Sequence, residues 1–322
     1  MPRPVGCRPR VSVVMTVFEP EPRFFNEAVE SVLRQTLADI ELVIIEDPPA
    51  GRPCDVLSRF SDPRIRYFRG SHRTSLIEQR NRALAEARAD LVAVLDCDDI
   101  AEPDRLERQT RYMDAHPDIA VLGSHVAVID GGGRIIGHRV FPREHDAIAR
   151  AMRRIVPLCH PSVVYRKELV ERAGGYSGRL APLAEDYELY SRLFLLGARF
   201  ANYPRALTRY RVHVAQAKAR RLRETIRAVL KVKNRYWRTS MSLGDRLRMW
   251  AERCLLCAPE AVVWRLLTSC HYHDKPPESP GDLSSELDPL HDVRREPASA
   301  PLLGTAPYAR VGDVAKSLRV CE

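Results

Sequence analysis

A buried strand that runs directly into a cluster of acids is the feature that most constrains this chain. Five apolar residues, Leu91–Leu95, are followed at once by three carboxylates, Asp96, Asp98 and Asp99. An unbroken apolar run of this length is typical of a strand covered on both faces, as in parallel sheets. Because an unpaired buried charge is costly, the acids must lie at the C-terminal end of the strand, where open α/β sheets bind ligands.

The acid cluster predicts a site for a divalent cation. Clustered carboxylates repel one another unless a cation lies among them, and their hard oxygen atoms suit Mg²⁺ or Mn²⁺, with substrate phosphates as further ligands. An alternative is that the acids only cap the next helix, with Asp99 preceding a helix start at Pro103. The buried strand before the acids favours the metal or phosphate site.

Length and composition limit the possible size of the fold and the location of the protein. A chain of 322 residues can form one large α/β domain with an appendage. Its start shows no secretory signal, and its apolar runs fall short of the ~20 residues of a membrane-spanning helix. The eight scattered cysteines are typical of reduced thiols in a cytosolic protein. The net charge of +9 is local, since residues 218–253 hold twelve Lys and Arg against three acids and the remainder balances to zero.

Hydrophobic periodicity predicts alternating strands and helices over the first 115 residues. The predicted strands are 11–17, 41–47, 65–68 and 91–95, and the predicted helices are 23–36, 54–60, 75–88 and 103–115. This alternation is typical of a doubly wound sheet with right-handed crossovers.

The second half of the chain predicts a mixed, antiparallel-leaning lobe. Its expected strands are 120–129, 135–141, 162–165, 198–203 and 207–212, with a hairpin at 130–133 and a helix at 182–196. Residues 218–240 and 242–268 predict basic amphipathic helices. Residues 1–10 and the proline-rich tail 271–322 are expected to be disordered.

The ordered set of motifs resembles a family 2 glycosyltransferase of the GT-A fold. The segments that carry the likeness are VSVVMTVFEP, AVESVLRQTLADIELVIIED, RNRALAEARADLVAVLDCDD, HPSVVYRKELVERAGGY, LAEDYELYSRL and YRVH. It covers about residues 10–215. The resemblance implies a catalytic domain over 11–215, with a nucleotide-sugar half (11–115) and an acceptor half (116–215). The fold class expected is thus α/β, a Rossmann-like doubly wound mixed sheet with an acceptor lobe, followed by basic helices at 216–270 and the tail.

The resemblance also implies an inverting enzyme that moves a sugar from a nucleotide-diphospho-sugar, with UDP as the expected nucleotide, to an acceptor hydroxyl. Thr16 and Phe18 fall where the family contacts the nucleoside, although Phe18 replaces the usual Tyr. Asp47 matches the acid that reads the base, in a Glu-Asp-Pro-Pro that replaces the usual Asp-Asp-Gly-Ser. Arg80 matches a position that faces the phosphates, and the alternative is an ordinary solvated arginine.

The remaining implied residues concern the cation and the acceptor. Asp96 would contact the donor, Asp98 would bind donor and metal, and Asp99 would support the metal. His213 falls where related folds supply a late histidine to the metal, or it is merely structural; Arg211 is a candidate phosphate clamp. Asp186 is the implied general base, which takes the proton of the attacking hydroxyl. Glu185 and His160 would lie on the acceptor side, with a core role as the alternative for His160.

Two other functional classes stay open at this point. Haloacid-dehalogenase-type phosphatases also place an Asp-x-Asp motif after a buried strand, although Ile100 stands where they carry Thr or Val. A non-catalytic, membrane-attached binding subunit would keep the fold without turnover. The intact acids in all three clusters favour the transferase, with cell-surface polysaccharide or glycolipid synthesis as its expected setting.

The C-terminal helices suggest partners other than the donor. A basic amphipathic segment with Trp on its other face, residues 218–268, favours an anionic membrane surface, and a solvated face closing over the catalytic domain is the alternative. The acceptor is expected to be a sugar or a lipid-linked sugar, and no nucleic acid is expected. We therefore expect a cytoplasmic protein, with peripheral attachment at the inner face of the cell membrane. Cys254, Cys257, Cys270, His271 and His273 have spacing that resembles a zinc site, but Cys254 and Cys257 lie in an apolar helical stretch, where packing as small apolar residues is favoured.

Overall fold

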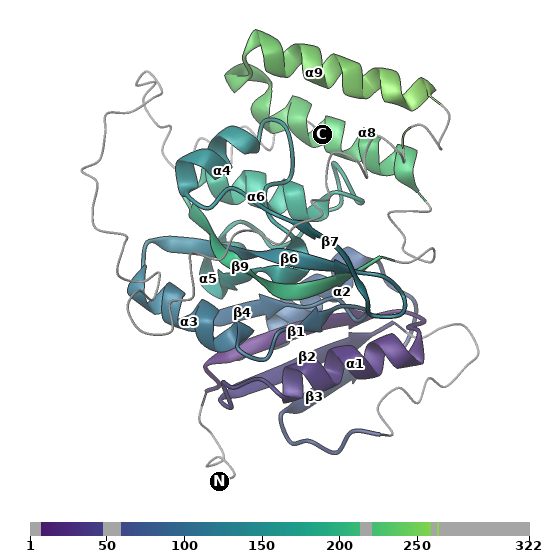
Figure 1. The fold of residues 1–322 in the computed structure, drawn as a ribbon, viewed down its shortest axis with the longest axis vertical. Coiled ribbons are helices and arrows are strands. Elements are labelled where there is room, and N and C mark those ends of the chain that lie inside the picture. Colours follow the sequence, from purple (N-terminus) through teal and green to yellow (C-terminus); the bar gives the residue numbers. More distant parts are fainter. Residues whose placement is uncertain (1–7, 48–58, 213–220, 259–262, 264–322) are drawn as a thin grey trace. The chain divides into compact units, whose positions relative to one another are not determined.

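A nine-stranded mixed sheet forms the centre of the molecule (Figure 1). The computed structural model describes residues 8–47, 59–212, 221–258 and 263. The strands are β1 (Val11–Val17), β2 (Ile40–Glu46), β3 (Ile65–Arg69), β4 (Leu91–Val94), β5 (Ile100–Ala101), β6 (Ile119–Ile129), β7 (Ile135–Arg139), β8 (Val164–Arg166) and β9 (Arg199–Arg211). The helices are α1 (Pro22–Leu33), α2 (Leu76–Glu86), α3 (Arg105–Ala115), α4 (His145–Ala151), α5 (Lys167–Arg172), α6 (Glu185–Leu195), α8 (Leu222–Val232) and α9 (Leu243–Cys254).

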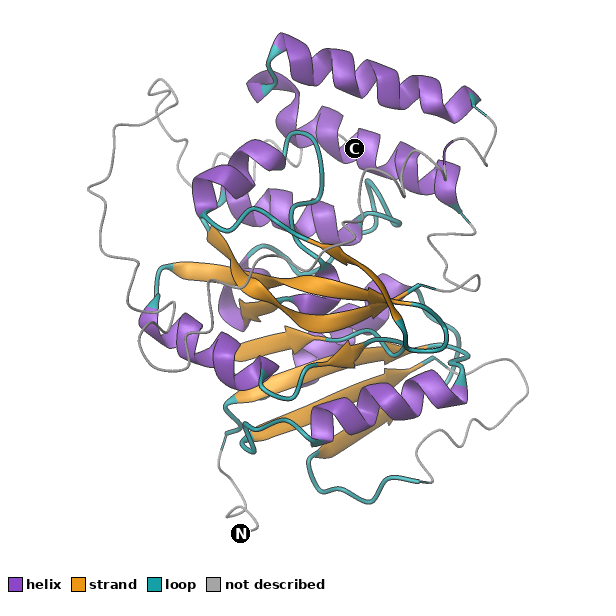
Figure 2. Cartoon of the chain, viewed as in Figure 1, coloured by secondary structure: helices purple, strands orange, loops and turns teal. Residues whose placement is uncertain are grey.

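The first half of the chain forms a parallel sheet in the order β3-β2-β1-β4. Helix α1 lies in front of these strands and α2 behind them (Figures 1 and 2), so both faces of the sheet are covered. Every residue of β2 and β4 is buried, as expected for a doubly covered parallel sheet. Because β1 connects onward to β2 on one side and is flanked by β4 on the other, the switch point of the sheet lies at β1 and β4. The predicted doubly wound fold is confirmed.

The second half continues the sheet with changed strand directions. Strand β8 is antiparallel to both β4 and β6, β7 is an antiparallel neighbour of β6, and β9 runs parallel to β6. The two strands predicted at 198–203 and 207–212 are one strand, β9. Its register against β6 jumps from Tyr203 to Ala206, so Pro204 and Arg205 form an irregularity within it. Proline has no N–H to donate and is tolerated in a sheet at such a bulge.

Several short elements have no clear periodic signal and were not predicted. They are the two-residue strand β5 and the helices α4 and α5. The strand expected at 162–165 is displaced to β8, because residues 160–162 form a single 3₁₀ turn. Most of the helix expected at 54–60 lies outside the described residues, and Arg59 and Phe60 are not helical.

The two basic helices are present, and the turn after α8 is bonded to α6. Helix α8 continues as a π-helical turn, Lys233–Trp237, and α9 starts at a capping box made by Ser242 and Asp245. The Trp237 indole Nε1 donates to Ser191 Oγ of α6 at 3.0 Å. Beyond residue 258 the predicted second helix lies outside the description, apart from Val263. No helix in the described ranges is both long and apolar enough to cross a bilayer.

Candidate functional site

A small pocket lies at the switch point of the sheet, at the C-terminal ends of β1 and β4. Its lining residues are Val14, Thr16, Arg80, Ala83, Val94, Leu95, Asp96 and Tyr176. Three of them, Thr16, Arg80 and Asp96, are donor residues predicted from the sequence. The fold therefore brings together residues from β1, α2 and the end of β4 at the position where α/β sheets bind ligands.

Arg80 connects the acid clusters across this pocket. Its guanidinium donates from Nη1 to Glu185 Oε1 and lies 3.7 Å from Asp96, measured between Nη2 and Oδ1. Although burial works against the charge of Arg80, the nearby carboxylates of Glu185 and Asp96 raise its pKa. Arg80 is therefore a fixed cation, and the alternative of a solvated helix arginine is wrong, since its side chain is only 10% exposed.

Tyr176 forms another wall of the pocket and was missed by the sequence analysis. The Arg80 guanidinium carbon lies 5.6 Å from the centroid of its ring. Asn81, the next residue of α2, donates to the Tyr176 carbonyl at 2.9 Å and accepts from its N–H at 2.8 Å. Gly175 allows this contact: its φ is +69°, and a Cβ there would lie 2.5 Å from Asn81 Oδ1. The Gly-Gly-Tyr turn thus holds the Tyr176 ring against Arg80.

The acids after β4 differ in their exposure. Asp96 and Asp98 are partly exposed, whereas Asp99 is fully buried. Asp99 Oδ1 accepts from the backbone N–H of Arg211 at 2.8 Å, and Arg211 Nε donates to the Asp98 carbonyl at 2.8 Å. Burial, together with the charges of Asp98 and Asp96, raises the pKa of Asp99 well above its usual range.

Arg211 positions the loop that carries the acids, residues 95–99, which we call the acid loop. Its side chain is fully buried, its guanidinium carbon lies 4.2 Å from the centroid of the Phe24 ring, and Nη2 pairs with Glu27. Arg105 on α3 is bonded to the end of β4, directly before this loop, because it donates to the carbonyl of Val94 at 2.9 Å. The expected role of Arg211 as a phosphate clamp is not supported, because a buried guanidinium with these partners has no access to a substrate.

The predicted nucleoside contacts lie around the end of β1. Phe18 is 38% exposed, and the Arg73 guanidinium carbon lies 4.5 Å from its ring centroid. Asp47, at the end of β2, is buried and accepts from the Thr74 N–H at 2.7 Å. The residues from 70 to 75 are thereby bonded to β2, and Arg73 is a second candidate residue that the sequence analysis missed.

The first turn of α6 carries the third acid cluster. Glu185 and Asp186 are both buried, with 1% and 6% of their surface exposed. Asp186 Oδ1 accepts from the backbone N–H of Tyr187 at 2.7 Å. A carboxylate in a helix's first turn also benefits from the helix dipole. Arg80 therefore joins Glu185 of α6 to Asp96, and Asp186 is the next residue of the same helical turn.

His160 lies in the core behind Tyr176. Its Nδ1 is 2.7 Å from Tyr190 Oη and its Nε2 is 3.3 Å from Tyr176 Oη. The residue is only 4% exposed. These contacts agree with the alternative of a core histidine, and they make His160 a support for Tyr176.

The donor set fits a cation that the substrate completes. Asp96 and Asp98 present partly exposed carboxylates, whereas Asp99 is buried and accepts from the Arg211 N–H. No group of three or more His, Cys, Asp or Glu side chains arranged for a metal occurs in the part of the chain that the structure describes. A site with one or two carboxylates and substrate phosphates is typical of Mg²⁺ and similar hard cations. His213, and the zinc-like Cys270, His271 and His273, lie outside the described residues. Cys254 and Cys257 are exposed, so the prediction that they pack as small apolar residues is wrong.

Comparison with known families decides the assignment. The family model described as glycosyl transferase family 2 matches residues 12–174, half of the chain. This chain is a family 2 glycosyltransferase. Family membership excludes the phosphatase alternative, because the acid motif after β4 is part of the segment that matches the glycosyltransferase family.

Curated relatives of this glycosyltransferase come from several bacteria. It is 27% identical to the putative glycosyltransferase EpsE of Bacillus subtilis over 83% of this chain and 94% of that protein. It is 31% identical to the amylovoran biosynthesis glycosyltransferase AmsE of Erwinia amylovora over 62% of this chain and 75% of that one. It is 29% identical to an Escherichia coli UDP-Gal:alpha-D-GlcNAc-diphosphoundecaprenol beta-1,3-galactosyltransferase over 66% and 78%.

Solved structures share the GT-A fold with this glycosyltransferase. The mannosyltransferase PcManGT of Pyrobaculum calidifontis, in complex with GDP-Man and Mn²⁺, has a TM-score of 0.54 at 15% identity, over 82% of this chain and 74% of that one. S. aureus TarS 1–349 with UDP-GlcNAc has a TM-score of 0.55 at 17% identity, over 69% and 66%. The chain spans 39% of a longer TarS chain. At these identities the likeness shows the fold alone.

Proposed function

We propose that this glycosyltransferase moves a sugar from a nucleotide-diphospho-sugar to an acceptor hydroxyl, in one displacement that inverts the anomeric centre. The observation that carries the proposal is the bridge made by Arg80, which holds Asp96 on the donor side and Glu185 on the α6 side of one pocket. This bridge supports the proposal, because it would hold a donor and Asp186, the residue after Glu185, within one preorganised charge arrangement.

Asp186 is the proposed general base. An acceptor hydroxyl is a weak nucleophile, so a fixed carboxylate must take its proton while the oxygen attacks C1. The carboxylate of Asp186 is buried in the first turn of α6, on a helix that Glu185 and Arg80 hold against the pocket. Attack from the face opposite the diphosphate needs no covalent sugar–enzyme intermediate.

A divalent cation, Mn²⁺ or Mg²⁺, is the proposed cofactor, held by Asp98 with support from Asp96. When bound, it would neutralise charge that develops on the departing nucleoside diphosphate. Arg211 and Arg105 keep the backbone of the acid loop in place, as their bonds to the carbonyls of Asp98 and Val94 indicate. Asp99 then acts mainly as a support for the loop.

The nucleotide is proposed to lie at the end of β1. Phe18 offers one ring face for stacking, with the Arg73 guanidinium beside it, and Asp47 can accept the N3–H of uracil. We propose UDP as the nucleotide. The E. coli relative named for a UDP-Gal donor and the TarS complex with UDP-GlcNAc support this choice, and the GDP-Man complex of PcManGT is the reason to test guanine as well.

A thermal-shift panel of UDP-, GDP- and dTDP-sugars, with and without Mn²⁺, tests the donor. A donor present at 100 times its Kd should stabilise the fold by about 2.7 kcal/mol. Release of nucleoside diphosphate then tests turnover. An Asp186→Asn variant should keep this donor-dependent stabilisation and lose transfer. Full transfer activity in that variant would exclude Asp186 as the base.

We further propose that the acceptor is lipid-linked or part of a surface polysaccharide, and that α9 attaches the enzyme to an anionic membrane. Relatives named for amylovoran biosynthesis and for a diphosphoundecaprenol acceptor support the acceptor class. On α9, Leu243, Leu247 and Trp250 follow an i, i+4, i+7 spacing and are 74%, 61% and 66% exposed. Such an apolar stripe on a basic helix is typical of interfacial helices.

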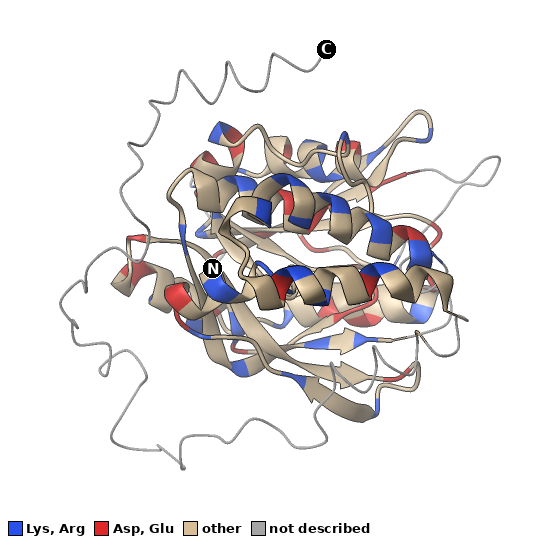
Figure 3. Ribbon diagram, turned by 90° about the horizontal axis from the view of Figure 1, so that it is seen from above, with Lys and Arg blue, Asp and Glu red and all other residues tan. Residues whose placement is uncertain are grey.

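The charges of α9 support an anionic partner. Its acids face inward: Asp245 is bonded to Arg154, and Glu252 pairs with Lys233 at 2.6 Å. Arg246 and Arg253 are exposed. Figure 3 looks onto the side where α8 and α9 lie and shows Lys and Arg along both helices.

Co-sedimentation with vesicles tests the attachment. Wild-type protein should pellet with phosphatidylglycerol-containing vesicles and stay in solution with pure phosphatidylcholine. A Leu247→Glu/Trp250→Glu variant should lose this binding. The matched control is Ile135→Glu/Ile136→Glu on β7, where the side chains are also exposed. Wild-type-like pelleting of the α9 variant would rule out this face.

A further inference from the structure

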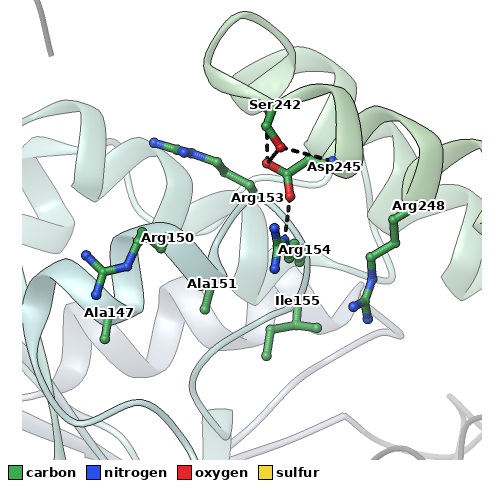
Figure 4. A pocket seen from close by; sticks show the side chains of 9 residues that line it. All are labelled: Ala147, Arg150, Ala151, Arg153, Arg154, Ile155, Ser242, Asp245 and Arg248. Carbon is green, nitrogen blue, oxygen red and sulfur yellow. Dashed lines mark hydrogen bonds and ion pairs between the residues drawn. The ribbon is translucent and has the colours of Figure 1, made fainter. Parts of the chain in front are cut away.

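A second pocket, about 490 Å³ in volume, lies between α4 with the segment after it and the start of α9 (Figure 4). We refer to it as the arginine pocket. Its lining residues are Ala147, Arg150, Ala151, Arg153, Arg154, Ile155, Ser242, Asp245 and Arg248. Its volume is within the range of small-molecule sites. Because it has four arginines and a single acid, its lining carries a clear positive excess.

The single acid of the arginine pocket is already neutralised. Asp245 Oδ1 accepts from Arg154, and its Oδ2 accepts from the Ser242 hydroxyl at 2.9 Å and from the Ser242 N–H at 3.1 Å. Figure 4 shows this Arg154–Asp245 pair between Arg150 and Arg153 on one side and Arg248 on the other. Both carboxylate oxygens are thus engaged, and none is left for the other arginines.

Two of the remaining arginines have no such partner. Arg150 and Arg153 form no ion pair with any residue in the described ranges, and the buried Nε of Arg153 has no hydrogen-bond acceptor there. Arg248 Nε pairs with Glu252 Oε1 at 3.4 Å, while the other oxygen of that carboxylate pairs with Lys233 at 2.6 Å. Guanidinium groups concentrated in one pocket repel one another unless an anion joins them.

We propose that the arginine pocket binds a phosphate-bearing ligand, with a diphosphate as the best match. The planar fork of arginine donates two parallel N–H bonds to phosphate oxygens, and two or three such forks match the several charged oxygens of a diphosphate. The diphosphate can belong to a lipid-linked acceptor or to a soluble molecule. The acceptor assignment rests on the proposed function, whereas binding of the anion does not.

The position of the pocket suits an acceptor role. The Tyr187 hydroxyl on α6 donates to the carbonyl of Met152, which lies between the pocket residues Ala151 and Arg153. The pocket wall is therefore bonded to the helix that carries Asp186. It shares no lining residue with the donor pocket at β1 and β4, so anion binding there should need no divalent cation.

Isothermal titration calorimetry on the full chain, with EDTA present, tests this inference. The probes are inorganic pyrophosphate and farnesyl diphosphate, a water-soluble prenyl diphosphate. Both should bind the wild-type protein, and an Arg150→Gln/Arg153→Gln variant should bind each at least about tenfold more weakly, since a charge-assisted hydrogen bond contributes this much or more. Tighter binding of farnesyl diphosphate would support a lipid source, and equal binding a soluble one.

The matched control is Arg34→Gln/Arg111→Gln, which removes two exposed arginines, one directly after α1 and one on α3. It should bind as the wild type does. Because Arg150 and Arg153 have no partners within the described residues, their variant should melt at the wild-type temperature, which a thermal scan verifies. The proposal is overturned if the wild type shows no binding heat, if the pocket variant binds normally, or if the control weakens binding equally. This assay measures binding and not donor turnover. A negative result would therefore overturn the anion-binding proposal and would not affect the transferase proposal.

Discussion

The bridge between Arg80 and Glu185 leads to a quantitative prediction. Glu185 is 1% exposed, and Arg80 donates to it directly. Removing one partner of a buried pair leaves an uncompensated charge and costs about 3–5 kcal/mol. Arg80→Gln should therefore lower the free energy of unfolding by about 3–4 kcal/mol.

The complementary change is expected to be milder. In Glu185→Gln, Arg80 keeps Asp96 at 3.7 Å as a partner, so the loss should be about 1–2 kcal/mol. The double variant lacks both charges of the pair, so neither is left buried without a partner. Its loss in free energy of unfolding should therefore be well below the sum of the two single losses. We expect a coupling free energy of at least about 2 kcal/mol.

Urea unfolding followed by circular dichroism measures the four proteins of this cycle. The matched control cycle uses the exposed pair Arg111 and Glu107 on α3, for which a coupling of about 0.3–0.5 kcal/mol is expected. If the Arg80–Glu185 losses add within about 0.5 kcal/mol, the bridge does not stabilise the site as argued. The double variant should also lose donor-dependent thermal stabilisation, because Arg80 lines the donor pocket.

Three further changes test other parts of the structure. Gly175→Ala should cost about 2 kcal/mol in urea unfolding, because its φ is +69° and the new Cβ would displace Asn81; an unchanged midpoint would contradict this contact. Burial, followed by the charge of Arg143, lowers the pKa of His125 to about 4 from 6.5. As the pH falls from 6.5 toward 4 the unfolded chain binds a proton that the folded chain does not, so stability should fall by roughly 3 kcal/mol, and His125→Gln should flatten this slope. Asp98→Asn should abolish the Mn²⁺ dependence of donor binding in the thermal-shift assay, whereas a retained Mn²⁺ effect would exclude Asp98 as the main ligand.

Much of the fold could be predicted because its signals are local. The apolar runs of β1, β2 and β4 and the periodic pattern of α2 each lie within a few residues. Strands such as β5, with two residues, and β8, with three, have no period to detect. They exist because neighbouring strands supply their hydrogen bonds, as when Ile100 and Ala101 pair with β9.

The candidate site was predictable in its acids and less so in their partners. Asp96 and Asp186 were assigned from their motifs, whereas Tyr176 ends the HPSVVYRKELVERAGGY segment without having been assigned a role, and Arg73 lies in no motif. Glu185 is 105 residues away from Arg80, a separation that no periodicity can bridge. Only the tertiary fold, which brings the start of α6 to Arg80 of α2, makes the two residues neighbours.

The sequence by itself determined that a buried strand ends in carboxylates, because apolar residues must leave water and unpaired charges cannot follow them. It could not determine which of these carboxylates faces a ligand. The tertiary structure decided that. Strand β9 brings the N–H of Arg211 to Asp99 and turns this acid inward, while Asp96 and Asp98 stay partly exposed. Local sequence does not encode hydrogen bonds between distant segments. These bonds distinguish the structural acid, Asp99, from the two acids that are proposed to bind donor and cation.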